Sequence, residues 1–287
     1  MYKYNNTDYH IHYYLDKCAN REMTIDNILK EAERLNLDEI CILKHYSKNL
    51  PNNKKSWVYW KKIIPEQFES YLKDINTKKT SSPVRLLSGV ETEILNDNGQ
   101  INIPGSDAEK LNVLLLSVHW LPDMSALKTD HKLIPGEFHR SPSDSVSNWI
   151  NQINSKDVSS ILENFVSAYV NAVKHNNYPL ILAHMSDGLE PLRNYKIPVD
   201  KLSDNELNYI MEPLMKICSK KHVLWELTEK AVKRSTVLKQ ANKLGVKFTA
   251  TVDAHCLHIK NHTNLAKHNE AEEYLNSLGL KKGNIKI

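Results

Sequence analysis

The 287-residue sequence predicts an α/β fold of alternating strands and helices, a parallel barrel or a doubly wound sheet, with the barrel favoured by the strand ends described below. Its short runs rich in Ile, Val and Leu lack polar alternation, which is typical of strands buried on both faces of a parallel sheet. Amphipathic helical patterns lie between these runs, and the alternation continues to the end of the chain. A chain of this length fits one α/β barrel or two ordinary domains. The sustained alternation favours one domain over residues 1–287.

The elements follow in order after a first strand around His10. The later strands are predicted at Glu39–Leu43, Val84–Val90, Val113–Val118, Leu180–Ala183, Val223–Leu227 and Val246–Val252. The helices are predicted at Thr24–Leu35, Pro65–Ile75, Val158–Lys174, Asp204–Lys220, Thr236–Leu244 and Leu265–Leu278. Thr24 suits a helix N-cap, and Gly245 and Gly279 suit helix ends. Two segments, about 47–62 and 122–148, interrupt the pattern and are predicted as long loops of the same domain.

The composition excludes several classes of protein. The 8 glycines are scattered and form no GxGxxG or P-loop motif, which argues against a glycine-rich nucleotide site. A net charge of +4 without a basic stripe argues against a nucleic-acid partner and is compatible with a small anionic substrate. The 4 cysteines form no CxxC pair, and neither a signal-peptide pattern nor a membrane-length apolar run is present. We therefore expect a cytoplasmic protein with free thiols and no membrane association.

The strongest local signal is the pair His10 and His12 in the sequence DYHIH. Residues i and i+2 of a strand project to one side, so both imidazoles can reach one cation. More side chains of metal-ligand type stand at the carboxyl ends of five of the six later strands: His45, Glu91, His119, His184, Asp253 and His255. In the remaining strand Glu226 lies inside the run. Strand ends of a parallel barrel converge on the face that holds the active site, so we expect these side chains to meet.

Nitrogen and oxygen ligands in this mixture suit Zn, Mn or Fe, and the few thiols argue against a closed structural zinc site. The ligands outnumber the needs of one ion, which predicts a cluster of two or more divalent cations. Two cations about 3.5–4 Å apart can hold a bridging hydroxide and clamp a phosphate for in-line attack. The sequence therefore favours phosphoester hydrolysis. A Ser-His-Asp triad has no support because GxSxG is absent.

Seven motifs in order carry a family resemblance: DYHIH, LKHYS, SGVETEI, LSVHWL, ILAHMSD, LWELT and TVDAHC. They resemble the polymerase and histidinol phosphatase (PHP) family, and most closely its histidinol-phosphatase branch. The resemblance covers nearly the whole chain, because NEAEEYLNSLGLKKGNIKI also matches the closing helix and strand of the branch. It implies a distorted (β/α)7 TIM-like barrel with a metal site at the carboxyl ends of the strands.

The resemblance also implies how the ligands divide. A first metal would be held by His10, His12, Glu91 and Asp253, a second by Glu91, His119 and His184, and a third with His45 and His255. Where the family completes the third site with histidine or aspartate, this chain has Cys18, with Asp16 two residues earlier, and either is a candidate ligand. Lys44 replaces the usual acidic residue, but strand alternation turns it away from His45. The predicted catalytic residues are Glu91, Asp253 and His255.

A phosphate also needs cationic partners, and a guanidinium can grip it bidentately. The candidates are Arg193 and Arg234, which follow predicted strands, and Arg140 in the long second loop. Trp120, beside His119, is predicted to line the pocket.

The leading hypothesis is a phosphomonoesterase acting through a metal-bridging hydroxide, with histidinol phosphate as its substrate. An alternative is another small substrate, a nucleotide or sugar phosphate. An amidohydrolase is disfavoured because Glu91, and not a lysine, ends its strand. A non-catalytic barrel that binds metal or a phosphorylated ligand stays open because of Cys18 and Lys44. The oligomeric state and the metal identity are left open.

Overall fold

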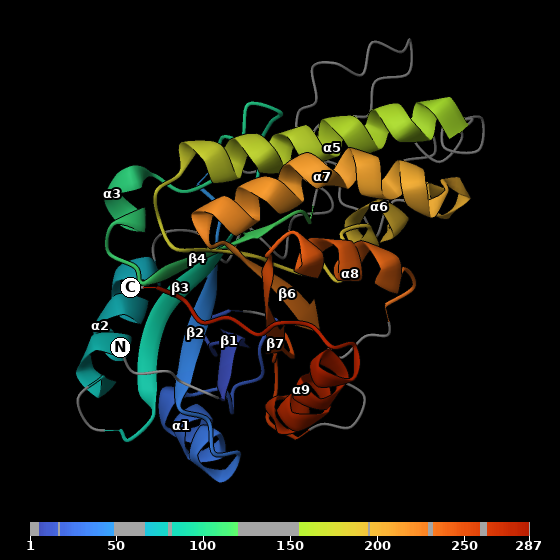
Figure 1. The fold of residues 1–287 in the computed structure, drawn as a ribbon. Coiled ribbons are helices and arrows are strands. Elements are labelled where there is room, and N and C mark those ends of the chain that lie inside the picture. Colours follow the sequence, from blue (N-terminus) through green and yellow to red (C-terminus); the bar gives the residue numbers. More distant parts are fainter. Residues whose placement is uncertain are drawn as a thin grey trace.

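Seven parallel strands stand side by side in chain order in the computed structural model, which describes residues 6–16, 18–48, 67–79, 82–119, 155–194, 196–228, 232–258 and 263–286 (Figure 1). The strands are β1 (Thr7–His12), β2 (Glu39–Tyr46), β3 (Arg85–Glu93), β4 (Val113–Ser117), β5 (Leu180–Leu182), β6 (Leu224–Thr228) and β7 (Lys247–Thr251). Ile11 of β1 pairs with Ala254, just beyond β7, and this bridge joins the two edges. The predicted seven-stranded α/β barrel is confirmed.

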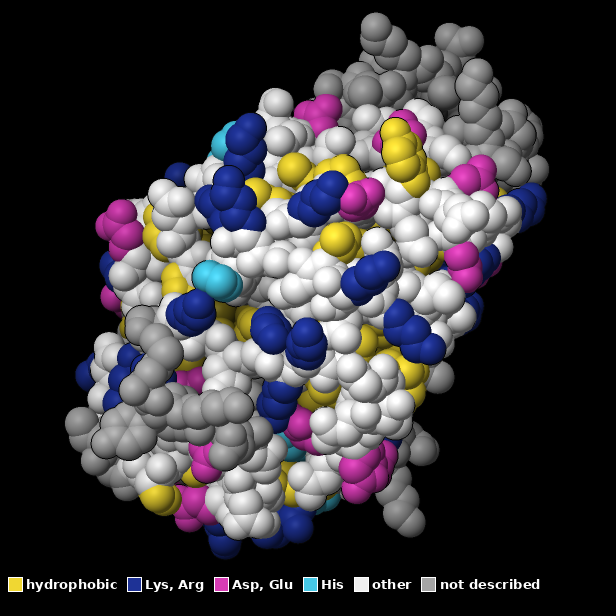
Figure 2. All heavy atoms as spheres, viewed as in Figure 1, with side chains coloured by type: hydrophobic (Ala, Val, Ile, Leu, Met, Phe, Trp, Pro, Cys, Tyr) yellow, Lys and Arg dark blue, Asp and Glu magenta, His cyan; other side chains and the backbone are white. Residues whose placement is uncertain are grey.

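Helices lie between successive strands and pack on the outside of the barrel (Figure 1). They are α1 (Ile25–Arg34), α2 (Phe68–Lys78), α3 (Gly105–Ala108), α5 (Ser155–His175), α6 (Glu190–Asn194), α7 (Asp204–Lys221), α8 (Ser235–Lys243) and α9 (His268–Ser277), with short 3-10 turns η4 (Val199–Lys201) and η5 (Leu265–Lys267). The two longest, α5 and α7, lie side by side on one flank. On that face Lys and Arg side chains are spread among acidic and uncharged ones, and hydrophobic side chains form small separate groups (Figure 2).

The barrel interior has an apolar floor below a polar upper layer. The floor is a separate cluster of buried side chains: Tyr9, Cys41, Leu43, Leu87, Val113, Leu115, Ile181, Ala183 and Leu224. Beneath it the hydroxyl of Tyr9 donates to Glu39 at 2.6 Å, and Glu39 pairs with Arg85. Alternation along each strand then sets polar side chains above the floor, towards the carboxyl ends. The floor therefore seals the lower barrel and leaves the upper interior for chemistry.

A β-bulge in the first strand shapes this interior. The register runs from Asp8 opposite Ile40 to Ile11 opposite Ile42, so β1 carries one residue more than β2 over this stretch. Bulges re-aim side chains and are frequent next to active sites. Here Tyr9 joins the floor while its neighbour His10 faces the same interior. The side chain of Asp8 accepts the backbone N–H of His10 at 3.0 Å, which satisfies a donor in the bulge.

Gly89 allows β2, β3 and β4 to pack closely around the floor. A Cβ at this position would lie 2.6 Å from Sγ of Cys41 and 2.7 Å from Cδ2 of Leu43, both buried. We therefore expect Gly89→Ala to destabilise the protein by about 1–3 kcal/mol, the usual cost of overpacking. Gly105→Ala is the matched control, because its Cβ would meet only Tyr178 at 3.4 Å. Equal urea midpoints for the two variants would contradict this packing role.

Two strands extend further than predicted, and the extension carries ligands. β2 continues through Lys44, His45 and Tyr46, and β3 continues through Glu91 to Glu93. The predictions stopped where polar residues began, but these residues are buried and their backbones stay in the ladder. Helix α2 begins at Phe68, later than predicted, and the last predicted helix divides into η5 and α9. The short helices α3 and α6 were not predicted.

The two long loops predicted at about 47–62 and 122–148 lie outside the described residues, apart from residues 47 and 48. The extent of one domain over all 287 residues therefore stays a prediction. None of the helices in the described part of the chain is long and apolar enough to span a membrane.

Candidate metal centre

Five imidazole rings surround the carboxylate of Glu91 at the carboxyl ends of the strands. Oε2 lies 3.4 Å from Nε2 of both His10 and His12 and 3.0 Å from Nε2 of His45. Oε1 lies 3.3 Å from Nε2 of His119 and 3.5 Å from Nε2 of His184. Glu91 is buried, and neither oxygen has a hydrogen-bond partner among the described residues. Each oxygen thus faces its own group of nitrogen atoms, which is the arrangement of a bridging ligand.

Asp253 closes the other side of the group. Its Oδ1 lies 3.1 Å from Nε2 of both His10 and His12, and its Oδ2 lies 3.5 Å from Nε2 of His184. The backbones of Asp253 and His184 have φ values of 49° and 52°. Non-glycine residues adopt this left-handed region at a cost, and such strain gathers at functional sites. Both side chains are thus aimed inward at the expense of backbone energy.

His10 and His12 show that this group is built for a cation. Nδ1 of His10 lies 2.7 Å from Glu226, and Nδ1 of His12 lies 3.0 Å from Asp16, so a ring that gives Nε2 to a metal keeps its remaining proton on Nδ1. Their Nε2 atoms lie 3.1 Å apart, close enough to share one cation. Two ligands at 2.0–2.1 Å on a tetrahedral zinc would lie about 3.4 Å apart. Four of the five separations around Glu91, at 3.3–3.5 Å, match that value better than hydrogen-bond lengths of about 2.7–3.2 Å, and the fifth, to His45, is 3.0 Å. The residues therefore fit a metal.

Four combinations of these side chains have ligand atoms close enough to share an ion. They are His10 with His12 and Asp253; His10 with Glu91 and His184; His45 with Glu91 and His119; and His12 with Asp16, Cys18 and His45. The structure therefore brings together the predicted ligands from β1, β2, β3 and the segments after β4, β5 and β7. Only His255, of the predicted metal ligands, is outside these combinations.

Three further carboxylates hold the rings from behind. Glu226 accepts from Nδ1 of His10 and also from the backbone N–H of His184 at 2.5 Å. Glu93 accepts from Nδ1 and the backbone N–H of His119, at 2.5 and 2.8 Å. Partners of this kind fix the tautomer and the orientation of a metal-binding histidine. Asp16 plays the same part for His12.

Glu93 and Glu226 were not predicted as site residues. Their signal was strand alternation: Glu93 lies two residues beyond Glu91, and two-residue spacing puts both on the inner face. Glu226 was noted only as an exception to the strand-end pattern. Its place one layer below the ends is what lets it reach His10 from behind.

The close packing of carboxylates and imidazoles shifts the pKa values of both kinds of group. Burial lowers the pKa of His10, but the facing carboxylates, Glu226 first, outweigh burial and raise it to about 10. Burial raises the pKa of Glu91, but the surrounding imidazoles, His119 first, hold it well below its ordinary range. The pKa of Asp253 is likewise held low, against burial, chiefly by His255. The carboxylates are thus anions at neutral pH, and their charge needs protons or metal cations nearby.

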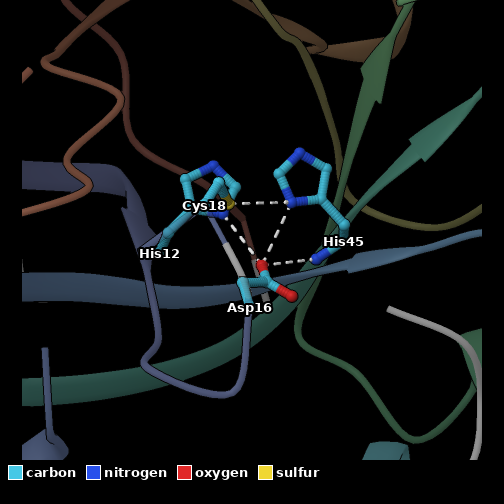
Figure 3. A group of neighbouring side chains, drawn as sticks. All are labelled: His12, Asp16, Cys18 and His45. Carbon is cyan, nitrogen blue, oxygen red and sulfur yellow. Dashed lines mark hydrogen bonds and ion pairs between the residues drawn. The ribbon is translucent and has the colours of Figure 1, made fainter. Parts of the chain in front are cut away.

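Cys18 and His255 lie at the edge of the group. Sγ of Cys18 is 3.7 Å from Nδ1 of His45 (Figure 3). The ring of His255 stacks on that of His12 at 4.3 Å, with Nδ1 against the carbonyl of Asp253 and the hydroxyl of Thr263. Lys44 precedes His45 in β2 and is buried. Its ammonium comes within 3.4 Å of Asp16.

The predicted phosphate-binding arginines have protein partners. Arg193 pairs with Asp187 at 2.7 Å and with Asp200 at 2.8 Å. Arg234 pairs with Asp204 and donates to the carbonyls of Asp200 and Leu202. Substrate binding by either guanidinium stays a prediction, and it would require exchange of these partners. Arg140 and Trp120 lie outside the described residues.

A pocket opens onto the metal-ligand group. It is lined by His184, Ser186, Glu190, Thr228, Val252, Asp253 and Thr263. His184 and Asp253 belong to both the pocket and the group, with exposed side-chain fractions of 27% and 21%. Glu91 beneath them is buried. A ligand in the pocket therefore meets the group at these two residues first.

No family model matches the chain. The structure of the histidinol phosphate phosphatase from Lactococcus lactis, complexed with zinc, L-histidinol and phosphate, resembles it with a TM-score of 0.60 and 14% identity over 98% of this chain and 99% of that chain. A Listeria monocytogenes protein assigned as a histidinol phosphatase has a TM-score of 0.55 and 12% identity, covering 87% of this chain and 95% of that chain. These likenesses show the fold.

Among curated proteins, two Thermoanaerobacter proteins, each named "Probable phosphatase", share 28% identity with the chain over 97 residues. The matched segment is 33% of this chain and 34% of each relative. The likeness thus spans about a third of the length of these curated relatives.

Proposed function

We propose that the chain is a metal-dependent phosphatase that hydrolyses a small phosphate monoester, with histidinol phosphate as the leading substrate. The observation that carries the proposal is the buried Glu91 carboxylate, whose two oxygens face five imidazole nitrogens at 3.0–3.5 Å without a hydrogen bond from any described residue. The fold neighbours and the partial curated relatives, which carry phosphatase names, support the same activity.

We assign two sites to Glu91. The first joins it to His10, His12 and Asp253, and the second joins it to His119 and His184. When bound, divalent cations there supply Lewis-acid activation of a phosphoryl group and of an attacking water. The donors are imidazoles and carboxylates, which suit Zn, Mn or Fe. His45 and His255 belong to a third site in this proposal.

The chain's own residues do the positioning. Glu226 and Glu93 hold His10 and His119 from behind, so the ligand nitrogens need little reorganisation when a substrate arrives. The floor of the barrel excludes water from below. Asp253 and His184 lie at the pocket, where they would meet the phosphate, and Asp253 stays ionised because its pKa is held low. Glu91, Asp253 and His255 are the proposed catalytic residues.

The activity test uses purified protein, p-nitrophenyl phosphate, histidinol phosphate and a panel of nucleotide and sugar phosphates. We expect phosphate release that a chelator abolishes and that Zn²⁺ or Mn²⁺ restores. An amide panel run in parallel tests amidohydrolase activity. Tight metal binding without turnover of any phosphate ester would overturn the proposal and would instead indicate a binding barrel.

Glu190 offers a specificity test within this proposal. Its carboxylate, 32% exposed and 3.9 Å from Nη1 of Arg193, lines the pocket beside the metal-ligand group. Exchange of that partner would let it pair with the amine or imidazole of histidinol. We expect Glu190→Gln to raise KM for histidinol phosphate by about tenfold, since one charge-assisted hydrogen bond is worth about 1.5–3 kcal/mol. KM for p-nitrophenyl phosphate, which lacks a cationic group, should not change. Equal effects on both substrates would remove Glu190 from substrate recognition.

A further inference from the structure

Glu226 contacts a ligand residue of each of the two sites assigned to Glu91. Its side chain is fully buried on β6. Oε1 lies 2.7 Å from Nδ1 of His10, a ligand of the first site, and Oε2 accepts the backbone N–H of His184, a ligand of the second site, at 2.5 Å. The ring centroids of these two histidines are 5.0 Å apart. One carboxylate thus stands behind one ligand of each site.

The turn that carries His184 has a strained backbone, and Glu226 holds it in two places. His184 and Ser186 follow β5 with φ values of 52° and 43°, in the left-handed region that non-glycine residues adopt at a cost. The carboxylate of Glu226 accepts the N–H of His184, and its backbone carbonyl accepts the N–H of Ser186 at 3.2 Å. Strained residues persist only where the surrounding structure over-determines them. Loss of the carboxylate therefore frees the backbone that aims the ring of His184.

A second donor fixes the other oxygen of the Glu226 carboxylate. The hydroxyl of Thr251, buried on β7, donates to Oε1 at 2.7 Å. Thr251 precedes Asp253 by two residues, so this contact ties Glu226 to the strand that leads into the first site. A buried carboxylate with donors from three segments has one orientation, because a rotation would leave a buried donor unpaired. Its contacts with the two sites are therefore set together.

We propose that Glu226 is a positioning residue shared by the two sites around Glu91, so that one side chain sets the ligand geometry for both cations. Loss of a carboxylate behind a metal-binding histidine lowers metal affinity by about 10–100-fold. For Glu226 that loss falls on both sites, through the ring of His10 and through the backbone of His184. The inference rests on the proposed function for the place of the two sites and not for turnover.

The main test counts the sites that a variant weakens. Metal-free full-length protein is titrated with ¹¹³Cd²⁺ against a competing chelator, and NMR of the bound ions gives one resonance for each site. In Glu226→Met, which removes both acceptor oxygens, two resonances should need about 10–100-fold more free Cd²⁺. Glu93→Met is the matched control, because Glu93 contacts one ligand imidazole, that of His119, and should weaken one site. A Glu226→Met protein with a single weakened site would overturn the proposal.

Two valine substitutions on β7 test the Oε1 side separately. Thr251→Val removes the hydroxyl that donates to Oε1 but leaves the carboxylate and its contact with His184 in place. It should weaken only the first site, and by less than Glu226→Met does. Thr249→Val is its matched control, because the buried Thr249 hydroxyl has no hydrogen-bond partner within the part of the chain that the structure describes. Equal Cd²⁺ binding by the two valine variants would contradict the Oε1 part of the proposal.

Hydrogen exchange tests the Oε2 side without any metal. The backbone N–H of His184 should exchange about tenfold faster in metal-free Glu226→Met than in the wild type, because its acceptor is gone. Glu93→Met should leave this rate unchanged, and amides of β2 report whether either variant has unfolded. An unchanged rate at His184 in a folded Glu226→Met protein would refute the hold on the turn.

Phosphatase activity is recorded separately from these measurements. A wild-type protein that binds no Cd²⁺ would overturn the metal centre and this inference with it. An inactive wild type, with both sites weakened by Glu226→Met, would refute only the proposed turnover. An active enzyme in which Glu226→Met weakens one site would refute only the shared positioning role.

Discussion

Glu91→Gln is expected to lower kcat/KM for phosphate esters by about a thousandfold. A shared anionic ligand holds the cations beside the reacting phosphate and so contributes several kcal/mol to stabilisation of the transition state. Each 1.36 kcal/mol is a tenfold change in rate. The amide keeps the size of the side chain but removes the charge that both groups of imidazoles face. Steady-state kinetics and the metal content of the purified variant measure the effect, and both should fall.

Glu93→Gln is the matched control on the same strand. His119 is the one ligand imidazole that Glu93 contacts, through Nδ1 and the backbone N–H. Glu93→Gln should therefore weaken metal binding by about 10–100-fold, and added metal should restore activity. Glu91→Gln should not be rescued. If the two variants behave alike at saturating metal, Glu91 is not a bridging ligand.

Chelation is expected to lower the thermal midpoint, and the loss should grow as the pH rises. In the metal-free protein His10 takes up a proton to pair with the carboxylates, which raises its pKa to about 10. A group with a raised folded pKa contributes stability that is complete below its unfolded value, about 6.5, and is lost as the pH rises towards the folded value. The metal-bound protein does not need these protons, because the cations neutralise the carboxylates.

Differential scanning calorimetry with and without chelator, between about pH 6 and pH 9, measures this gap. A saturating metal at a hundredfold excess over its Kd contributes about 2.7 kcal/mol for each site. Metal binding strengthens over the same range because protons compete for the imidazoles. A gap that is constant or narrows towards high pH would show that protonated imidazoles do not replace the metal.

The barrel and most of its candidate ligands could be predicted from the strands and the polar residues at their ends. Apolar runs predicted six of the seven strands, and the histidine pair marked the first. His10, His12, His119 and His184 stand where β1 ends or just beyond β4 and β5. Polarity was a poor guide to where β2 and β3 end, because His45 and Glu91 are buried inside the ladder. A strand can continue through a buried polar residue when that residue finds polar partners on other strands. The sequence pattern of a single strand does not show those partners.

The carboxylates that hold the ligand histidines from behind could not be predicted from the sequence for the same reason. Glu226 reaches back to His10 across the barrel, from a residue 216 positions later in the chain. Arg193 illustrates the opposite case, because its position suggested phosphate binding while its guanidinium lies between Asp187 and Asp200. A charged side chain's partner is set by three-dimensional proximity, and the sequence supplies only the candidates.

The extra residue in β1 separates the length of the strand from the direction of its side chains, which are linked in a regular strand. In a regular strand a change of length by one residue turns every later side chain to the opposite face. In β1 the bulge stores one residue, so deletion of Tyr9 would restore regular pairing with β2 and still leave His10 and His12 inward. The loss would be Tyr9's own part of the floor and its hydrogen bond to Glu39. For protein engineering, β1 is thus a strand whose length can be edited without dismantling the ligand set.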